Sequence, residues 1–276
     1  MVRRPLGNHH DGPDTLLVTP ETRQADAVTA EKRNETGTGD GTGADDGPDG
    51  LRHLVEGARV VLWDFDGPVC RLFAGHSAER VANGLASWLE GRGLHGLLTA
   101  AERESLDPQV LLRAVDRRHP GSDLVAELEE RLTQEELRAA GSAMPTPYAD
   151  PLIRTWTAVG SRLAVATDNS PRVVREYLAS RGLGACFAPH IYGRTQELNR
   201  LKPDPHCIRR ALNAMGAAPA TALMIGDAPT DLRAAQAADV PFLGYARTGR
   251  KGELLREAGA TAVVESLEPV LRLVRH

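Results

Sequence analysis

The sequence predicts an α/β fold in which a doubly wound parallel sheet carries an inserted helical subdomain. From residue 162 onwards, apolar strand-like runs alternate with helix patterns, as they do in parallel sheets with helices on both faces. About one hundred residues separate the first strong strand from the next, which is too long for a plain crossover connection. A polar, acidic stretch precedes the first strand. These observations predict a core, an insertion and a disordered N-terminal tail.

The first predicted strand begins at Val60 and stops where Gly67 and Pro68 turn the chain sharply. Asp64 and Asp66 lie two residues apart at its end, so both side chains can project to the same side. In open α/β sheets, ligands bind at this carboxyl end. Two carboxylates this close repel each other unless a cation neutralises them, and Mg²⁺ shared with a phosphate is suitable. Taken alone, the pair also fits an ordinary turn with two solvated carboxylates.

The insertion is expected at residues 71–147, between core segments at residues 58–70 and 148–276. Its apolar residues recur at helical spacing in two stretches. They are Val81, Leu85, Trp88 and Leu89 in the first stretch and Leu124, Leu128 and Leu132 in the second. A third helix is predicted at residues 108–119, and Pro145 and Pro147 mark the return to the core.

The second half of the chain is predicted to complete the sheet. Further strands are expected at residues 162–167, 187–192, 222–225, 240–245 and 261–264. The helices between them begin at capping residues or prolines, and two of them end at glycines. The start signals are Ser170 with Pro171, Asp204 with Pro205, and Pro229; the end signals are Gly182 and Gly216; a last helix starts near Leu267.

The charged residues are divided unevenly along the chain. Residues 1–50 carry ten acidic and five basic residues and are rich in Gly, Asp and Thr. Such a segment buries too little apolar surface to offset its ordering entropy, so we expect it to be a disordered tail. Residues 51–276 carry 27 acidic and 28 basic residues. This near neutrality argues against a nucleic-acid partner.

The cysteine content and the hydropathy pattern favour a cytoplasmic protein. Cys70, Cys186 and Cys207 form no Cys-x-x-Cys pair, which indicates neither a disulfide framework nor a zinc site and fits a reducing compartment. No apolar run is long enough to span a membrane. The run at residues 16–18 is too short for the core of an export signal. We therefore expect no membrane partner.

Polar residues suited to phosphate chemistry follow the predicted strands. The first strand ends in Asp64 and Asp66, the second in residues 167–169, and the strand at 222–225 in residues 226–231. Lys202 stands just before a helix start. A nucleophilic carboxylate, a metal, a hydroxyl donor and a cation complement one another around a phosphate.

These motifs resemble those of the haloacid dehalogenase (HAD) superfamily. Four occur in the order and spacing of that family: Asp-Phe-Asp-Gly at residues 64–67, Thr167, Lys202 with Pro203, and Gly226 with Asp227 and Asp231. Each motif alone is a weak signal, but four in order are a strong one. The resemblance covers residues 58–276 and implies a Rossmann-like core. The insertion is similar to the helical cap of the phosphoglycolate phosphatase-like branch.

The resemblance implies how the reaction would proceed. Asp64 would attack phosphorus and become an aspartyl-phosphate. Asp66 would protonate the leaving oxygen and then accept a proton from the attacking water. Lys202 would neutralise negative charge on the nucleophile and on the phosphate.

The resemblance also implies a phosphate site and a metal site. Thr167 would donate its hydroxyl to the phosphate, in a loop that includes Asp168, Asn169 and their backbone N–H groups. Mg²⁺ would be the cofactor. Its ligands would be the Asp64 carboxylate, the Asp66 carbonyl and Asp227, while Asp231 would position the waters of the metal or Lys202.

Two further observations bear on this interpretation. Only three of the 33 basic residues are lysines, namely Lys32, Lys202 and Lys251, so a lysine at position 202 indicates a need for a compact point charge. Pro68 stands where the family usually has threonine, and Ala228 where serine or an acid is frequent. Neither departure removes a catalytic group, so we expect lowered or narrowed activity rather than its loss.

The resulting hypothesis is a Mg²⁺-dependent phosphatase that acts on a small phosphorylated metabolite as a monomer or homodimer. A phosphomutase or phosphotransferase would use the same aspartyl-phosphate but exclude water. A noncatalytic phosphate-binding regulator on this fold is a third possibility, which the complete set of polar positions disfavours. Asp66 argues against the metal-independent dehalogenases, which lack the second acid of the first motif.

Overall fold

The computed structural model describes residues 48–275, so the predicted tail lies outside the described residues except for its last three positions. Those positions begin helix α1 (Pro48–Gly57), which therefore starts before the expected end of the tail. No helix within residues 48–275 is long and apolar enough to cross a membrane.

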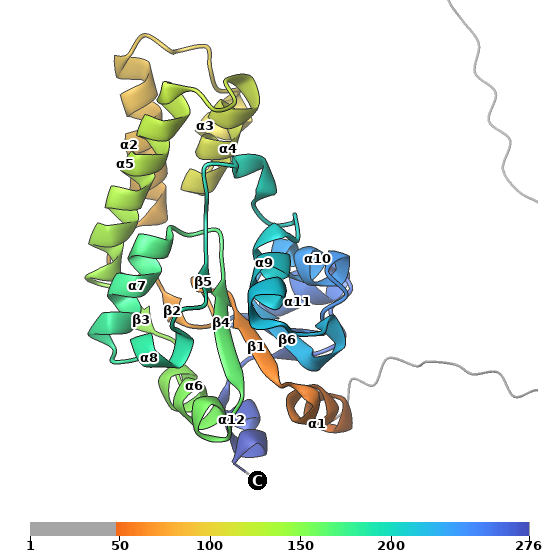
Figure 1. Cartoon of the computed structure of the whole chain (residues 1–276). Helices are drawn as coiled ribbons and strands as arrows, with labels where there is room; N and C mark the ends of the chain where they lie inside the picture. The colour runs from red at the N-terminus through yellow and green to blue at the C-terminus, as the bar shows by residue number, and fades with distance from the viewer. Residues whose placement is uncertain (1–47, 276) are drawn as a thin grey trace, which may run out of the picture. The chain divides into compact units, whose positions relative to one another are not determined.

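A six-stranded parallel sheet forms the core. The strand order β5-β4-β1-β6-β7-β8 places β1, which leads into the first motif, inside the sheet between β4 and β6 (Figure 1). Val60 of β1 is in register with Arg162 of β4 and Ala222 of β6, so these three strands end side by side. The strands are β1 (Val60–Trp63), β4 (Arg162–Ala166), β5 (Ile191–Tyr192), β6 (Ala222–Gly226), β7 (Phe242–Tyr245) and β8 (Val263–Val264).

Helices pack on both faces of the sheet because successive residues of a strand point to opposite sides. Val61 and Trp63 of β1 join one buried apolar cluster, while Val60 and Leu62 join another. The first face is covered by α1, α6 (Ala149–Ala158), α7 (Pro171–Ser180), α8 (Gly184–Phe187) and α12 (Glu268–Val274). The second is covered by α9 (His206–Met215), α10 (Pro229–Ala237) and α11 (Gly249–Glu257). This arrangement confirms the predicted fold class.

The helices between β2 and β3, which we call the cap, gather around a third apolar cluster. Figure 1 shows them at the top of the view, away from α6 and α12. Leu198 and Leu201 join this cluster from the segment that leads to Lys202, so the cap packs against a core loop. The cap consists of α2 (Ala78–Gly91), α3 (Ala100–Arg103), α4 (Pro108–Arg118) and α5 (Asp123–Ala140).

Several short features differ from the prediction. The chain enters and leaves the cap through an antiparallel ribbon of β2 (Cys70–Arg71) and β3 (Met144–Pro145). Strands of two residues are too short to show a period-two pattern. Helix α6 was not predicted. The strand predicted at residues 187–192 is wrong at its start, because Phe187 ends α8 and only Ile191–Tyr192 pair with β4.

Candidate active site

A cavity of about 790 Å³ lies where core and cap meet. Asp64, Thr167 and Asp227 directly follow β1, β4 and β6, so three distant parts of the sequence converge at neighbouring strand ends. The cap contributes residues 106–110, Arg113 and Glu136 to the lining. All of the predicted site residues line this cavity, namely Asp64, Asp66, Thr167, Asp168, Asn169, Lys202, Asp227 and Asp231.

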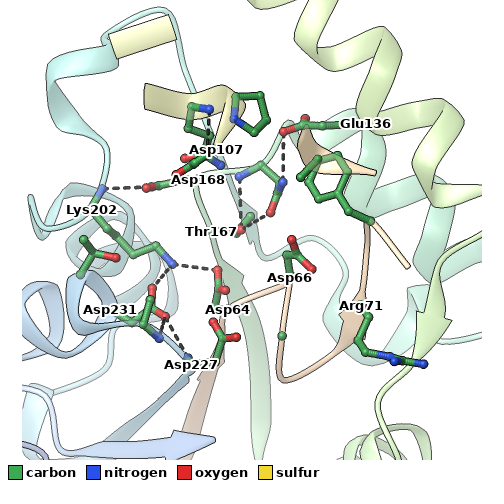
Figure 2. Close-up of a pocket in the computed structure, with 18 of the residues that line it drawn as sticks. Asp64, Asp66, Arg71, Asp107, Glu136, Thr167, Asp168, Lys202, Asp227 and Asp231 are labelled. Carbon is green, nitrogen blue, oxygen red and sulfur yellow. Dashed lines mark hydrogen bonds and ion pairs between the residues drawn. The ribbon is translucent and has the colours of Figure 1, made fainter. Parts of the chain in front are cut away.

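The ammonium group of Lys202 lies between two buried carboxylates (Figure 2). Its Nζ is 2.7 Å from Oδ1 of Asp64 and 2.5 Å from Oδ1 of Asp231. It also donates to the carbonyl of Ala166 at 3.2 Å. Lys202 is only 2% exposed, so water screens these interactions weakly. The lysine therefore holds Asp64 in place and compensates part of its charge.

The turn after β1 depends on glycine. Gly67 has φ of 134°, and a Cβ atom at this position would collide with the Asp227 carboxylate. The N–H of Gly67 donates to the carbonyl of Cys70 at 2.6 Å, and the hydroxyl of Thr146 donates to the carbonyl of Gly67 at 2.5 Å. The ring of Pro68 removes neither of these hydrogen bonds. The proline is therefore compatible with a closed turn.

Asp66 is the second acid of the site. Its Oδ1 accepts the N–H of Leu72 at 2.8 Å, which fixes the carboxylate after the turn. Figure 2 shows Asp64 and Asp66 as neighbours in the cavity. The two acids have different partners, since Asp64 meets a buried cation while Asp66 meets a neutral amide.

Three carboxylates form a donor set for a hard divalent cation. Oxygens of Asp64, Asp227 and Asp231 all lie within 4.8 Å of one another. Asp231 uses both of its oxygens, because Oδ2 accepts the N–H groups of Asp227 at 3.0 Å and of Ala228 at 3.1 Å while Oδ1 faces Lys202. Asp64 and Asp227 each keep one oxygen that pairs with no group within residues 48–275. Direct metal ligation therefore suits Asp64 and Asp227, whereas Asp231 acts as their support.

The loop after β4 holds Thr167 in a defined position. The hydroxyl of Thr167 donates to Oδ1 of Asn169 at 3.1 Å and accepts the N–H of Asn169 at 3.2 Å. Asp168 has other partners, since its Oδ1 accepts the N–H of Lys202 at 3.0 Å and its Oδ2 pairs with Arg113 of the cap at 2.7 Å. A carboxylate would also repel a phosphate. Asp168 therefore supports Lys202 in this structure, and phosphate contact by this loop stays a prediction.

Several lining residues were not identified from the sequence. Arg113 and Glu136 belong to cap helices whose distance from the motifs hid their position. Lys251 forms an ion pair with Oδ2 of Asp227. Lysine is rare in this sequence, and this argument, which we used for Lys202, could have identified Lys251 as well. Arg71 and Arg247 also line the cavity, which adds to the positive charge around the acids.

Burial changes the protonation of the acids. Burial raises the pKa of Asp64 to about 8 against the opposing charge of Lys202, and Asp231 and Asp227 add to the rise. Burial also raises the pKa of Asp66 to about 7, against the hydrogen bond from Leu72. For Lys202, burial disfavours the charge, but Asp231 and Asp64 outweigh it and raise the pKa above its usual value. An acid with a pKa near 7 is suited to both giving and taking a proton at neutral pH.

We expect the metal-free protein to lose stability as the pH rises from about 6 to about 8.5. In the folded chain burial raises the pKa of Asp64 to about 8 and that of Asp66 to about 7, whereas the ordinary pKa of an aspartate is 3.8. The unfolded chain thus binds fewer protons in this window, so raising the pH favours unfolding. Melting temperatures measured in EDTA across this range test the expectation. The double variant Asp64→Asn with Asp66→Asn should show a shallower decline, and an equal slope in both proteins would contradict the assignment.

The family model of haloacid dehalogenase-like hydrolases matches residues 58–239. The chain belongs to this family. The plasmid-encoded phosphoglycolate phosphatase of Cupriavidus necator is 29% identical over 239 residues, covering 85% of this chain and 90% of that protein. Phosphoglycolate phosphatase 1 of Pseudomonas aeruginosa is 27% identical over 226 residues, covering 77% and 78% of the two chains. These relatives support the phosphoglycolate phosphatase-like branch for this HAD-like hydrolase, as the helical insertion after its first motif predicted.

Solved structures share the fold of this HAD-like hydrolase. The crystal structure of a predicted phosphoglycolate phosphatase from Haemophilus somnus 129pt aligns with a TM-score of 0.57 at 17% identity, covering 79% of this chain and 97% of that one. CbbY from Rhodobacter sphaeroides, crystallised in complex with phosphate, aligns with a TM-score of 0.57 at 22% identity, covering 76% and 94%. At these identities the alignments establish the fold of core and cap, and the chemistry has to be argued from the site.

Proposed function

We propose that this hydrolase releases inorganic phosphate from a small phosphomonoester through a phosphoryl group carried on Asp64. The observation that supports this reaction is the Asp64 carboxylate, held 2.7 Å from the buried ammonium of Lys202, with Asp66 beside it in the same cavity. A phosphate dianion would be repelled by an uncompensated carboxylate. The lysine lowers this repulsion in a site where charges interact strongly.

The first half of the reaction forms the covalent intermediate. An oxygen of Asp64 attacks phosphorus in line, and the bond from phosphorus to the ester oxygen breaks. Protonated Asp66 gives its proton to the departing oxygen, which leaves as an alcohol. The raised pKa of Asp66, about 7, keeps a substantial fraction of this acid protonated at neutral pH.

The second half regenerates the enzyme. Asp66, now ionised, takes a proton from a water molecule as that water attacks phosphorus, and the bond to Asp64 breaks. Inorganic phosphate leaves, and Asp66 is again protonated. Thr167 and the backbone N–H groups of its loop would hold the phosphate oxygens in both halves, while Lys202 offsets the charge that moves onto Asp64.

Mg²⁺ is the proposed cofactor, since the acids provide hard oxygen donors. Asp64 and Asp227 would hold it through their carboxylates, with the carbonyl of Asp66 as a further ligand. Asp231 would fix Asp227 through the backbone N–H that it accepts at 3.0 Å. When bound, the ion would supply positive charge that neutralises the phosphate and Asp64 together.

The cavity supports a small anionic substrate. Arg71, Arg113, Arg247 and Lys251 surround the catalytic acids and add positive charge beyond the proposed phosphate site. Cap residues line the cavity together with the core loops, and its volume of about 790 Å³ suits a small ester. The relatives named phosphoglycolate phosphatases agree with a small phosphorylated metabolite as substrate.

The purified protein is expected to release phosphate from p-nitrophenyl phosphate and from 2-phosphoglycolate when Mg²⁺ is present. EDTA should abolish release, and added Mg²⁺ should restore it, because the acids repel the substrate without a cation. Phosphate release from a panel of phosphate esters is the measurement. A phosphorylated acceptor in place of free phosphate would instead support a phosphotransferase. Absence of both products across the panel would disprove the enzymatic proposal.

A further inference from the structure

A buried ionic cluster joins cap helix α5 to the loop after β4. The side chain of Arg194 is 0% exposed and that of Glu136 is 1% exposed. Nη1 of Arg194 donates to Oε1 of Glu136 at 2.9 Å, and Nη2 donates to Oε2 at 3.1 Å. The guanidinium and the carboxylate therefore form a two-pronged pair with no access to solvent.

Glu136 also accepts two hydrogen bonds from the loop that carries Thr167. Its Oε1 accepts from Nδ2 of Asn169 at 3.0 Å, and its Oε2 accepts the N–H of Ser170 at 3.1 Å. A carboxylate offers acceptors only, so the amide nitrogen of Asn169 must face Glu136. The amide oxygen of Asn169 is consequently turned toward Thr167, whose hydroxyl donates to it at 3.1 Å.

Arg194 binds two backbone carbonyls of the same loop. Its N–H donates to the carbonyl of Asn169 at 3.0 Å, and its Nη1 donates to the carbonyl of Asp168 at 3.0 Å. The loop is thus fixed by both members of one ion pair, which come from different segments of the chain. Chains of such bonds in a low-dielectric interior are rigid only when every member is satisfied.

Stability alone gives little reason for this arrangement. A buried ion pair can often be replaced by apolar side chains without loss of stability, since its attraction is offset by the cost of removing two charges from water. The pair instead specifies one geometry for residues 167–170. On the basis of the proposed function, we propose that Glu136 is a positioning residue for phosphate binding, acting with Arg194 through Asn169 on Thr167.

The proposed phosphate site therefore depends on a cap residue, Glu136, that does not itself contact phosphate. Helix α5 is tied to the core at Glu136, so this part of the cap is a fixed wall of the site. The contact made by Arg113 on α4 differs, because its side chain is 28% exposed in the pair with Asp168. Changes at Glu136 should therefore alter phosphate affinity itself rather than access to the cavity.

The chain offers a matched control in the same helix. Oε1 of Glu129 accepts from Nε of Arg194 at 2.9 Å and from the hydroxyl of Thr133 at 2.9 Å. Its contacts do not include residues 167–170, and its side chain is 28% exposed. Glu129→Gln removes one charge from the cluster just as Glu136→Gln does. The two variants thus separate loss of charge from loss of the loop contact.

The full-length protein with Mg²⁺ is titrated with inorganic phosphate by calorimetry, and phosphate is also tested as an inhibitor of p-nitrophenyl phosphate hydrolysis. Glu136→Gln should weaken phosphate binding and raise its inhibition constant about tenfold, which corresponds to loss of one well-placed interaction. Glu129→Gln should stay within about twofold of the wild type. Melting temperatures, taken separately, show that each measurement is made on folded protein.

A double-mutant cycle with Asn169→Ala tests the proposed route. If Glu136 acts through Asn169, the two effects should not add. The double variant should then bind phosphate as tightly as whichever of the two single variants has the lower phosphate affinity. Should Glu136→Gln fail to fold, Asn169→Ala leaves the ion pair intact and must still weaken binding. Unchanged phosphate affinity in Glu136→Gln, or in Asn169→Ala, overturns the inference while leaving the proposed reaction in place. A wild-type protein that neither binds phosphate nor hydrolyses esters overturns both.

Discussion

Asp64→Asn is expected to reduce phosphate release by at least about 10⁴-fold. The asparagine amide is close in shape to the carboxylate, but it is a poor nucleophile and forms no aspartyl-phosphate. An asparagine also has only one side-chain oxygen, so the oxygen that Asp64 keeps for the metal while the other contacts Lys202 is lost as well. Steady-state hydrolysis of p-nitrophenyl phosphate with saturating Mg²⁺ measures the effect.

The fold should survive this substitution, because Lys202 keeps Asp231 at 2.5 Å as a counter-ion. An unchanged circular dichroism spectrum and melting temperature would therefore assign the loss to chemistry. Asp239→Asn is a matched control, since Asp239 is exposed, lies outside the cavity and has φ of 57°, which asparagine tolerates. Its activity should equal that of the wild type. Substantial turnover in Asp64→Asn would require a different nucleophile.

The sequence was sufficient to predict the central strands of the sheet because they are apolar runs separated by clear helix signals. Val60 to Trp63, for example, are all fully buried, and such runs are recognisable without knowledge of their neighbours. The convergence of Asp64, Thr167 and Asp227 followed from the rule that parallel strands end at one edge. The strand order β4-β1-β6 places these residues side by side.

The contacts between cap and core could not be predicted in this way. Glu136 looks like one of many acids on an amphipathic helix, and nothing near it in the sequence marks it as buried. Its partner Arg194 lies 58 residues away, in a loop without a motif. Asp168 was grouped with Thr167 because the two are adjacent, but only the structure shows that its oxygens face Lys202 and Arg113. Long-range polar pairing depends on the packing of whole elements, which local patterns do not encode.

Lys202→Met is expected to reduce turnover about 10²- to 10³-fold, the usual cost of removing one preorganised charge from a transition state. Methionine has nearly the same length and can fill the buried space, so the change removes the charge with little loss of packing. Without the ammonium group, Asp64 and Asp231 repel each other and the incoming phosphate. The loss should therefore appear in turnover and in phosphate affinity together.

The same variant should be less stable, and the loss should depend on pH. Removing one partner of a buried pair leaves an uncompensated charge and typically costs about 3–5 kcal/mol. Asp64 can escape part of this cost by binding a proton, and loss of the nearby cation raises its pKa beyond the value of about 8 that it has beside Lys202. The melting temperature of Lys202→Met should therefore go on falling above about pH 8, where the contribution of Asp64 to the decline in the wild type has ended. Lys202→Arg restores the charge but not the shape, because a planar guanidinium does not fit where a compact ammonium meets three oxygens. Full activity in Lys202→Arg would show that any cation suffices at this position and would remove the case for a point charge.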